Sequence, residues 1–263
     1  MLTFADWLAL REAADASARS TELADEVRER LRGRSTVTVH DLGTGTGAMG
    51  RWLAPRLDAP QHWILYDRDD DLLALAQARV APEAKVTTRN TDITRLTAAD
   101  LGDADLITAS ALLDMFTGAE VARVVDACAG VRCPVLFTLS VIGDVRLTPA
   151  DPLDAEIMAA FNAHQRRTAH GRSLVGPDAA KLTIDAFTYR GARVVERSTP
   201  WTLGADQADL IAEWFKGWLG AACEQRPELA GPVEAYAARR LAENAAGDLR
   251  VTVGHVDLLV VWD

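Results

Sequence analysis

At 263 residues the chain is long enough to bury a sizeable core in one large domain, and its formal net charge of -10 at pH 7 disfavours a phosphate backbone as partner. Its three cysteines, Cys128, Cys133 and Cys223, include no ligand-like C-x-x-C pair, which predicts a reducing compartment and no structural zinc. The sequence has no secretory leader pattern and no apolar run long enough for a membrane helix, so we expect a cytoplasmic protein without a membrane partner.

The first segment has the spacing of amphipathic helices. Apolar side chains recur among Ala, Arg and Glu over residues 4–31, which predicts one helix, or two with a break at Ser20-Thr21. The β-branched run TVTVHDL, residues 36–42, then ends at a cluster of glycines and predicts the first strand. We expect a helix over residues 48–57 after those glycines.

Strand and helix patterns continue to alternate as far as residue 139. They predict, in chain order, a strand at 62–66, a helix at 70–79, strands at 85–88 and 105–109, a helix at 118–128 and a strand at 135–139. Such repetition is typical of a parallel, doubly wound sheet with helices on both faces.

The second half of the chain is richer in helical patterns. It predicts helices near 152–168 and 177–189 joined by a Gly-Arg-Ser linker, a strand at 193–198, helices near 208–223 and 229–245, and a final strand. No internal repeat and no long linker divides the sequence, so we expect a single domain over residues 1–263.

The glycines after the first strand admit two interpretations. Gly45, Gly47 and Gly50 spell G-x-G-x-x-G, the pattern with which dinucleotide-binding proteins hold a pyrophosphate at a helix N-terminus. Asp41, however, stands just before the first glycine, Gly43, and a carboxylate there would repel a pyrophosphate. A cofactor that carries an amine and a sulfonium but no phosphate would be attracted instead.

The segment VHDLGTGTG, residues 39–47, resembles the first motif of the class I S-adenosylmethionine-dependent methyltransferases, in which an acid follows an apolar strand and precedes G-x-G-x-G. The resemblance implies that Asp41, Gly43, Gly45 and Gly47 bind S-adenosyl-L-methionine. It also implies a Rossmann-like sheet of seven strands, mostly parallel, in which the last two strands form the antiparallel edge.

Three later segments resemble further motifs of the same family. Asp67 ends the second strand where the family's acid holds the ribose hydroxyls, and Arg68 would lie beside the adenine. In NTDIT the resemblance assigns the adenine amino group to Asp92 and the ring to Ile93. In DLITASALLD it passes Ser110 under the cofactor. The four motifs cover roughly residues 36–140.

The N-terminal helix carries a row of charged residues. Arg11, Asp15 and Arg19 are spaced by four and share one helical face. The row is either an exposed ion-pair ladder, or part of a lid over residues 1–34 in which Arg11 or Arg19 meets the methionine carboxylate of the cofactor. Both interpretations stay open on the sequence, with residues 35–145 as the cofactor-binding half and 146–263 as the substrate side.

The catalytic residues are less constrained by the sequence. Methyl transfer requires alignment of the acceptor and, where the acceptor carries a proton, a base. Asp114 follows the fourth strand and Asp144 the fifth, at the edge where ligands bind in such sheets. His164 lies on a predicted helix of the insertion after strand five and has a side chain suited to proton removal. We expect His164 or Asp114 to serve as the base, and no metal site.

The sequence therefore predicts a methyltransferase that acts on an oxygen or nitrogen of a small molecule. The N-P-P-Y form of the fourth motif, used on nucleobase amines, is absent. Arginine-rich, lysine-poor usage indicates a GC-rich bacterial genome. The alternatives are an rRNA methyltransferase, an NAD(P)-dependent oxidoreductase and a non-catalytic adenosyl-binding regulator. The oligomeric state stays open.

Overall fold

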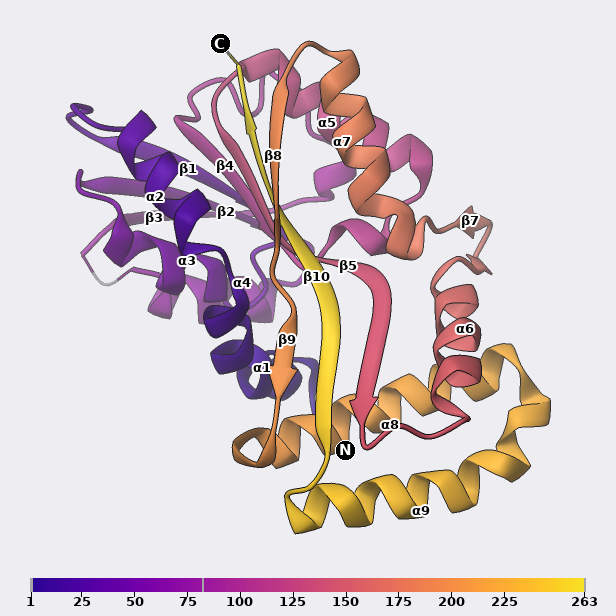
Figure 1. Cartoon of the computed structure of the whole chain (residues 1–263). Helices are drawn as coiled ribbons and strands as arrows, with labels where there is room; N and C mark the ends of the chain where they lie inside the picture. Colours follow the sequence, from indigo (N-terminus) through magenta and orange to yellow (C-terminus); the bar gives the residue numbers. More distant parts are fainter. Residues whose placement is uncertain (1, 82, 263) are drawn as a thin grey trace.

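A central β-sheet organises the chain, and the computed structural model describes residues 2–81 and 83–262 around it (Figure 1). The main path of this sheet runs β3-β2-β1-β4-β5-β10-β8, and a short strand, β9, pairs with β10. The strands of the sheet are β1 (Val37–Leu42), β2 (Gln61–Asp67), β3 (Lys85–Asn90), β4 (Leu106–Ser110), β5 (Val135–Thr148), β8 (Arg193–Ser198), β9 (Trp201–Leu203) and β10 (Arg250–Val261).

The strand directions confirm the predicted fold class. Strands β1 to β5 pair in parallel, as the alternation of strands and helices predicted. β10 runs antiparallel to both β5 and β8, so β8 at the edge is parallel to the first five strands. The antiparallel strand is thus the last one alone, placed one position inside the edge that we expected two strands to form.

Helices cover the two faces of the sheet and build an additional layer at one end (Figure 1). Side chains of α2, α3 and α4 pack on one face, and those of α5 and α7 pack on the other. None of the described helices has the length and apolar composition needed to cross a membrane. The helices are α1 (Phe4–Ala18), α2 (Thr21–Arg30), α3 (Ala48–Leu53), α4 (Asp70–Arg79), α5 (Gly118–Val131), α6 (Asp154–Gln165), α7 (Ala179–Tyr189), α8 (Ala208–Gln225) and α9 (Ala230–Ala246).

Strands β5 and β10 are longer than their neighbours and extend beyond the parallel sheet. Their pairing continues from Val135 to Thr148 on β5, through two register shifts. Leu139 and Gly143, both on β5, have positive φ angles of 57° and 76°, which bend the strand. The far half of these strands, with β9, forms a second core against α1, α6, α8 and α9.

The insertions occur where the sequence predicted them. α6 and α7 lie between β5 and β8, and α8 and α9 lie between β9 and β10. The expected Gly-Arg-Ser linker is the turn and second strand of a small hairpin, β6 (Thr168–Ala169) and β7 (Arg172–Ser173). This hairpin reaches back toward α5, because Leu174 forms a β-bridge with Thr117.

A fully buried carboxylate joins the N-terminal helices to the sheet. Asp257 on β10 is 0% exposed and accepts hydrogen bonds from the backbone N–H groups of Ser20 and Leu139, each at 2.8 Å. The hydroxyl of Thr199 donates to the same carboxylate at 2.9 Å. The junction of α1 and α2 is therefore held at the place where β5 bends.

The third glycine of the G-x-G-x-x-G pattern has a packing role. A Cβ at Gly50 would lie 1.8 Å from Cγ2 of Val80, which is buried at the end of α4. Glycine at this position thus lets α3 approach α4 closely.

We therefore expect Gly50→Ala to reduce the free energy of unfolding by about 1–3 kcal/mol, because the added methyl group overpacks a closed contact. Gly217→Ala is the matched control, since Gly217 is an exposed helical glycine with no atom within 4 Å of an added Cβ. That variant should gain up to about 1 kcal/mol from the lower chain entropy of alanine. Urea denaturation measures both, and equal effects of the two substitutions would contradict this account.

Candidate functional site

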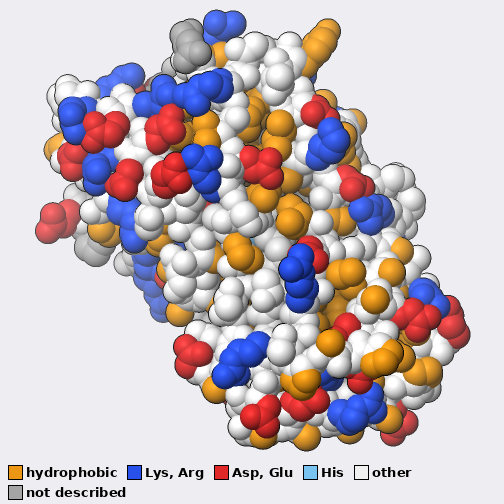
Figure 2. Space-filling model, viewed as in Figure 1, with side chains coloured by type: hydrophobic (Ala, Val, Ile, Leu, Met, Phe, Trp, Pro, Cys, Tyr) orange, Lys and Arg blue, Asp and Glu red, His pale blue; other side chains and the backbone are white. Residues whose placement is uncertain are grey.

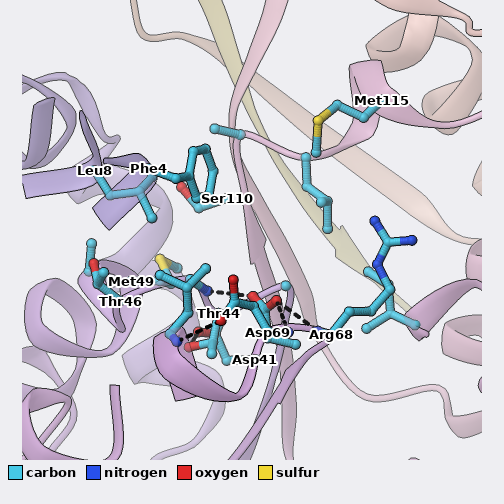
Figure 3. Close-up of a pocket in the computed structure, with 18 of the residues that line it drawn as sticks. Phe4, Leu8, Asp41, Thr44, Thr46, Met49, Arg68, Asp69, Ser110 and Met115 are labelled. Atoms are coloured by element: carbon cyan, nitrogen blue, oxygen red, sulfur yellow. Dashed lines mark hydrogen bonds between the residues drawn. The ribbon is translucent and has the colours of Figure 1, made fainter. Parts of the chain in front are cut away.

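A large cavity opens at the carboxyl ends of β1, β2 and β4, under the N-terminal helix α1 (Figure 3). Its volume is about 1210 Å³. Figure 3 shows Phe4 and Leu8 of α1 on one side, Met115 on another, and Asp41 and Thr44 of the glycine turn below them. The predicted site residues that line the cavity are Arg11, Arg19, Asp41, Gly43, Gly45, Asp67, Arg68, Asp92, Ile93, Ser110 and Asp114.

The glycine turn forms the floor of this cavity. Gly43, Gly45 and Gly47 have φ angles of 68°, 54° and 84°, a region that side chains rarely adopt. A Cβ at Gly45 would lie 3.1 Å from Cδ1 of Leu8, so α1 approaches the turn closely. Gly47 itself lies outside the lining and precedes α3, where an added Cβ would lie 3.2 Å from the backbone of Ala76.

Asp41 lies buried directly beneath the turn, with 1% of its surface exposed. Its two oxygens accept hydrogen bonds from the hydroxyls of Thr44 at 2.6 Å and Thr108 at 2.7 Å. Burial raises the pKa of this carboxyl, and the two hydroxyl donors partly offset that effect. The floor therefore carries an acidic group whose charge two neutral hydroxyls stabilise.

Asp67 ties the end of β2 to the same turn. Its Oδ2 accepts from the N–H of Gly45 at 2.9 Å, and its Oδ1 accepts from the N–H groups of Arg68 and Asp69 at 2.7 and 3.2 Å. Further along the cavity, Asp92 accepts from the N–H and hydroxyl of Thr94 at 3.0 and 2.7 Å. Both acids are thus oriented by local donors before any ligand contacts them.

The charged row of α1 contains one paired and one incompletely paired arginine. Arg11 forms a bidentate ion pair with Asp15, whose Oδ1 also accepts from the indole N–H of Trp201 at 3.0 Å. Arg19 is 3% exposed; its Nη2 donates to Oγ of Ser110 at 3.0 Å, and its Nη1 has no partner among the described residues. Burial without a full set of partners lowers the pKa of Arg19 and leaves a donor for a ligand.

The opposite end of the cavity is less polar and contains Asp114. This residue follows β4 in a short helical turn beside Met115 and Phe116. Burial raises the pKa of its carboxyl, and no hydrogen bond to its side-chain oxygens is present among the described residues. At the rim, Arg172 of the β6–β7 hairpin forms an ion pair with Glu120 at 2.7 Å and donates to the carbonyl of Met115.

The other candidate bases lie elsewhere. His164 is on α6 outside the cavity lining, with its Nε2 3.2 Å from Oε2 of Glu224 on α8. Its neighbour on the other ring nitrogen is Arg167. The expectation that His164 acts as the base therefore loses its geometric support. Asp144 also lies outside the lining, in an ion pair with Arg146.

Several lining residues were not singled out from the sequence. Phe4, Trp7 and Leu8 extend the face of α1 that carries Arg11, so their helical spacing contained the signal. The hydroxyl of Thr46 is buried without a partner, which only the folded turn reveals. Arg172 comes from an insertion 52 residues after Glu120, and no local pattern predicts that meeting. The described residues contain no group of three or more His, Cys, Asp or Glu side chains placed to hold a metal.

Comparison with protein families gives one match, which coincides with the glycine turn and the strands around it. Residues 39–134 match the model described as a methyltransferase domain. None of the curated proteins matches the sequence.

Solved structures share the fold over most of the chain at low identity. One described as a candidate methyltransferase from Bacillus halodurans is 13% identical, with a TM-score of 0.50 over 92% of this chain and 97% of the other. The YcgJ protein of Bacillus subtilis is 12% identical, with a TM-score of 0.50 over 93% of this chain and all of the other. A SAM-dependent methyltransferase from Geobacter sulfurreducens, solved with S-adenosyl-L-homocysteine, is 17% identical, with a TM-score of 0.46 over 98% and 99%.

The environment of Asp114 predicts how its replacement alters stability. A carboxyl whose pKa is raised in the folded state contributes stability below its unfolded pKa and loses it as pH rises through the folded pKa. Asp114→Asn removes this titration, so we expect a higher Tm than wild type at pH 7 and a difference that shrinks toward zero near pH 4.

Thermal unfolding monitored by circular dichroism across this pH range tests the effect. Asp58→Asn, at an exposed carboxylate, is the control and should show no such pH-dependent gain. A lower Tm of Asp114→Asn at pH 7, or a gain that is equal at both pH values, would contradict the assignment of an unpaired buried charge.

Proposed function

Because this chain carries a class I S-adenosylmethionine-dependent methyltransferase domain, an enzyme fold whose cofactor is S-adenosyl-L-methionine, we propose that it transfers a methyl group to an oxygen or nitrogen of a small-molecule acceptor. The observation that carries the proposal is the buried Arg19 with a free Nη1 at the wall of a cavity floored by Asp41 and the glycine turn.

The residues present fit this cofactor. An amino acid carboxylate needs a cationic donor, and Arg19 has an Nη1 donor without a partner. A cofactor with an ammonium and a sulfonium suits a floor with the acid Asp41, which would disfavour a pyrophosphate. The side-chain-free backbone at Gly43 and Gly45 leaves room above that floor. The unpartnered hydroxyl of Thr46 offers a further donor.

Five residues would hold the remainder of the cofactor. Asp67, already oriented by three backbone N–H groups, would accept hydrogen bonds from ribose hydroxyls. Asp92 would accept from the adenine amino group while Ile93, which is 8% exposed, packs on the ring. Arg68 and Ser110 line the same cavity, and Ser110 also accepts from Arg19.

The chain's contribution to the reaction is positioning and proton removal. When bound, S-adenosyl-L-methionine supplies an electrophilic methyl group on a sulfonium sulfur. The wall formed by α1 excludes water, and the residues after β4 orient the acceptor for in-line attack. Asp114 would take a proton from the acceptor, because its carboxyl faces the cavity and its raised pKa makes it a better base than an ordinary Asp.

Small molecules suit this site better than nucleic acid. On the face drawn in Figure 2, Lys and Arg side chains are interspersed with Asp and Glu side chains and form no continuous basic surface. The net charge of -10 works in the same direction. The cavity also lies partly under α1, where a polymer would have to displace that helix.

Binding of S-adenosyl-L-homocysteine tests the proposal and the role of Arg19. We expect micromolar affinity by calorimetry, and a loss of about tenfold or more in Arg19→Met, because a charge-assisted hydrogen bond is removed. Binding of 5′-methylthioadenosine, which lacks the amino acid part, should be unaffected by Arg19→Met. Asp67→Asn should weaken both ligands, since both contain the ribose.

Arg11→Met is the matched control on the same helix, because Arg11 is already paired with Asp15 and should lose little affinity. Binding of NAD or NADP in place of the homocysteine ligand, or no binding of either class, would refute the proposed function. Equal losses in Arg11→Met and Arg19→Met would refute the role assigned to Arg19.

A further inference from the structure

The acceptor end of the cavity has an unequal distribution of available charge. Both arginines on that side are already engaged with acids, Arg11 with Asp15 at 2.9 Å and Arg172 with Glu120 at 2.7 Å. The ion pair with Arg172 is strong enough to lower the pKa of Glu120 to about 2. Neither cation is available to a ligand without breaking an existing pair.

Asp114 provides the opposite situation at the same end. It lines the cavity, and its carboxyl oxygens have no hydrogen-bond donor among the described residues. Burial raises its pKa, as expected for a charge that lacks compensation. A ligand that brings a positive charge or an N–H donor would complete this group, whereas an anionic ligand would be repelled by it.

The walls around Asp114 are apolar and aromatic. Trp7 and Phe4 come from α1, and Met115 and Phe116 come from the segment after β4. Phe4 and Met115 are 61% and 50% exposed, so large apolar surface awaits a partner at the cavity mouth. Aromatic faces beside a carboxylate are a setting that attracts an ammonium group through both cation–π and ionic contacts.

The cavity is also large enough to hold a second molecule. Its volume of about 1210 Å³ exceeds the range of about 300–1000 Å³ that is usual for a pocket with one drug-sized ligand. The cofactor-binding residues occupy the floor and the β1–β2 side, which leaves the end with Asp114 for the acceptor.

Resting on the proposed function, we infer that the acceptor is an amine with an apolar or aromatic body, whose nitrogen binds beside Asp114. A carboxylate or phosphate ester would find no unpaired cation at this end. The amine nitrogen forms the new N–CH3 bond with its lone pair as the S–CH3 bond breaks and its electrons remain on sulfur. The proton lost by the nitrogen passes to the Asp114 carboxylate and then to water.

A matched ligand series distinguishes this class of acceptor from others. The probes are tryptamine, tryptophol and indole-3-propionate, which share a ring and a two-carbon arm and differ in carrying an ammonium, a hydroxyl or a carboxylate. With the protein saturated by S-adenosyl-L-homocysteine, we expect calorimetry to show tryptamine binding about tenfold or more tighter than either other probe. With S-adenosyl-L-methionine, mass spectrometry should detect N-methylated tryptamine.

The variant Asp114→Asn should abolish the preference for the ammonium probe while retaining the affinity for S-adenosyl-L-homocysteine. Asp144→Asn is the control, because that carboxylate lies outside the cavity in an ion pair with Arg146 and should leave the preference intact. Retained binding of the homocysteine ligand by Asp114→Asn also shows that the variant is folded.

The outcomes separate this inference from the proposed function. If S-adenosyl-L-homocysteine fails to bind wild type, the proposed function itself is wrong. If it binds but tryptamine does not, or the carboxylate or hydroxyl probe binds as tightly, the amine acceptor is wrong and the cofactor assignment stands. A preference that survives in Asp114→Asn overturns the role of Asp114.

Discussion

The carboxylate of Asp257 is the interaction on which the geometry of the cavity depends. It is completely buried on β10 and receives donors from three separate parts of the chain, at Ser20, Leu139 and Thr199. Since burial of such a charge is costly unless donors surround it, these three parts must meet for the carboxylate to be compensated. Their meeting fixes where α1 ends, and therefore where Arg19 enters the wall of the cavity.

The cavity combines groups that are oriented in advance with groups that lack partners. Asp67 and Asp41 are held by several donors each, so little ordering remains to be done when a ligand contacts them. Arg19 and Asp114 keep unsatisfied hydrogen-bonding capacity inside the fold. Such groups reduce the stability of the empty protein, and a ligand that completes them recovers that free energy as affinity.

The cofactor side could be predicted because its residues occupy short, local patterns. A glycine turn after a strand has few conformations, and an acid at a strand end of a parallel sheet faces the ligand edge wherever the strand lies. The acceptor side could not be predicted in this way. His164 has the chemistry of a base, but α6 packs on α8 and turns its imidazole toward Glu224. Helix periodicity defines faces without stating which partner each face meets.

By itself, the sequence determined the strand and helix alternation, the fold class and the cluster of glycines and acids at the carboxyl edge of β1 and β2, because these follow from local propensity and spacing. Tertiary structure alone decided which arginine of α1 keeps a free donor, since Asp15 pairs with Arg11 while Arg19 enters a buried corner beside Ser110 and Thr138. It also decided that Arg172 closes on Glu120 and that Asp114 is left unpaired. Those outcomes depend on contacts between segments far apart in the chain, which no local pattern encodes.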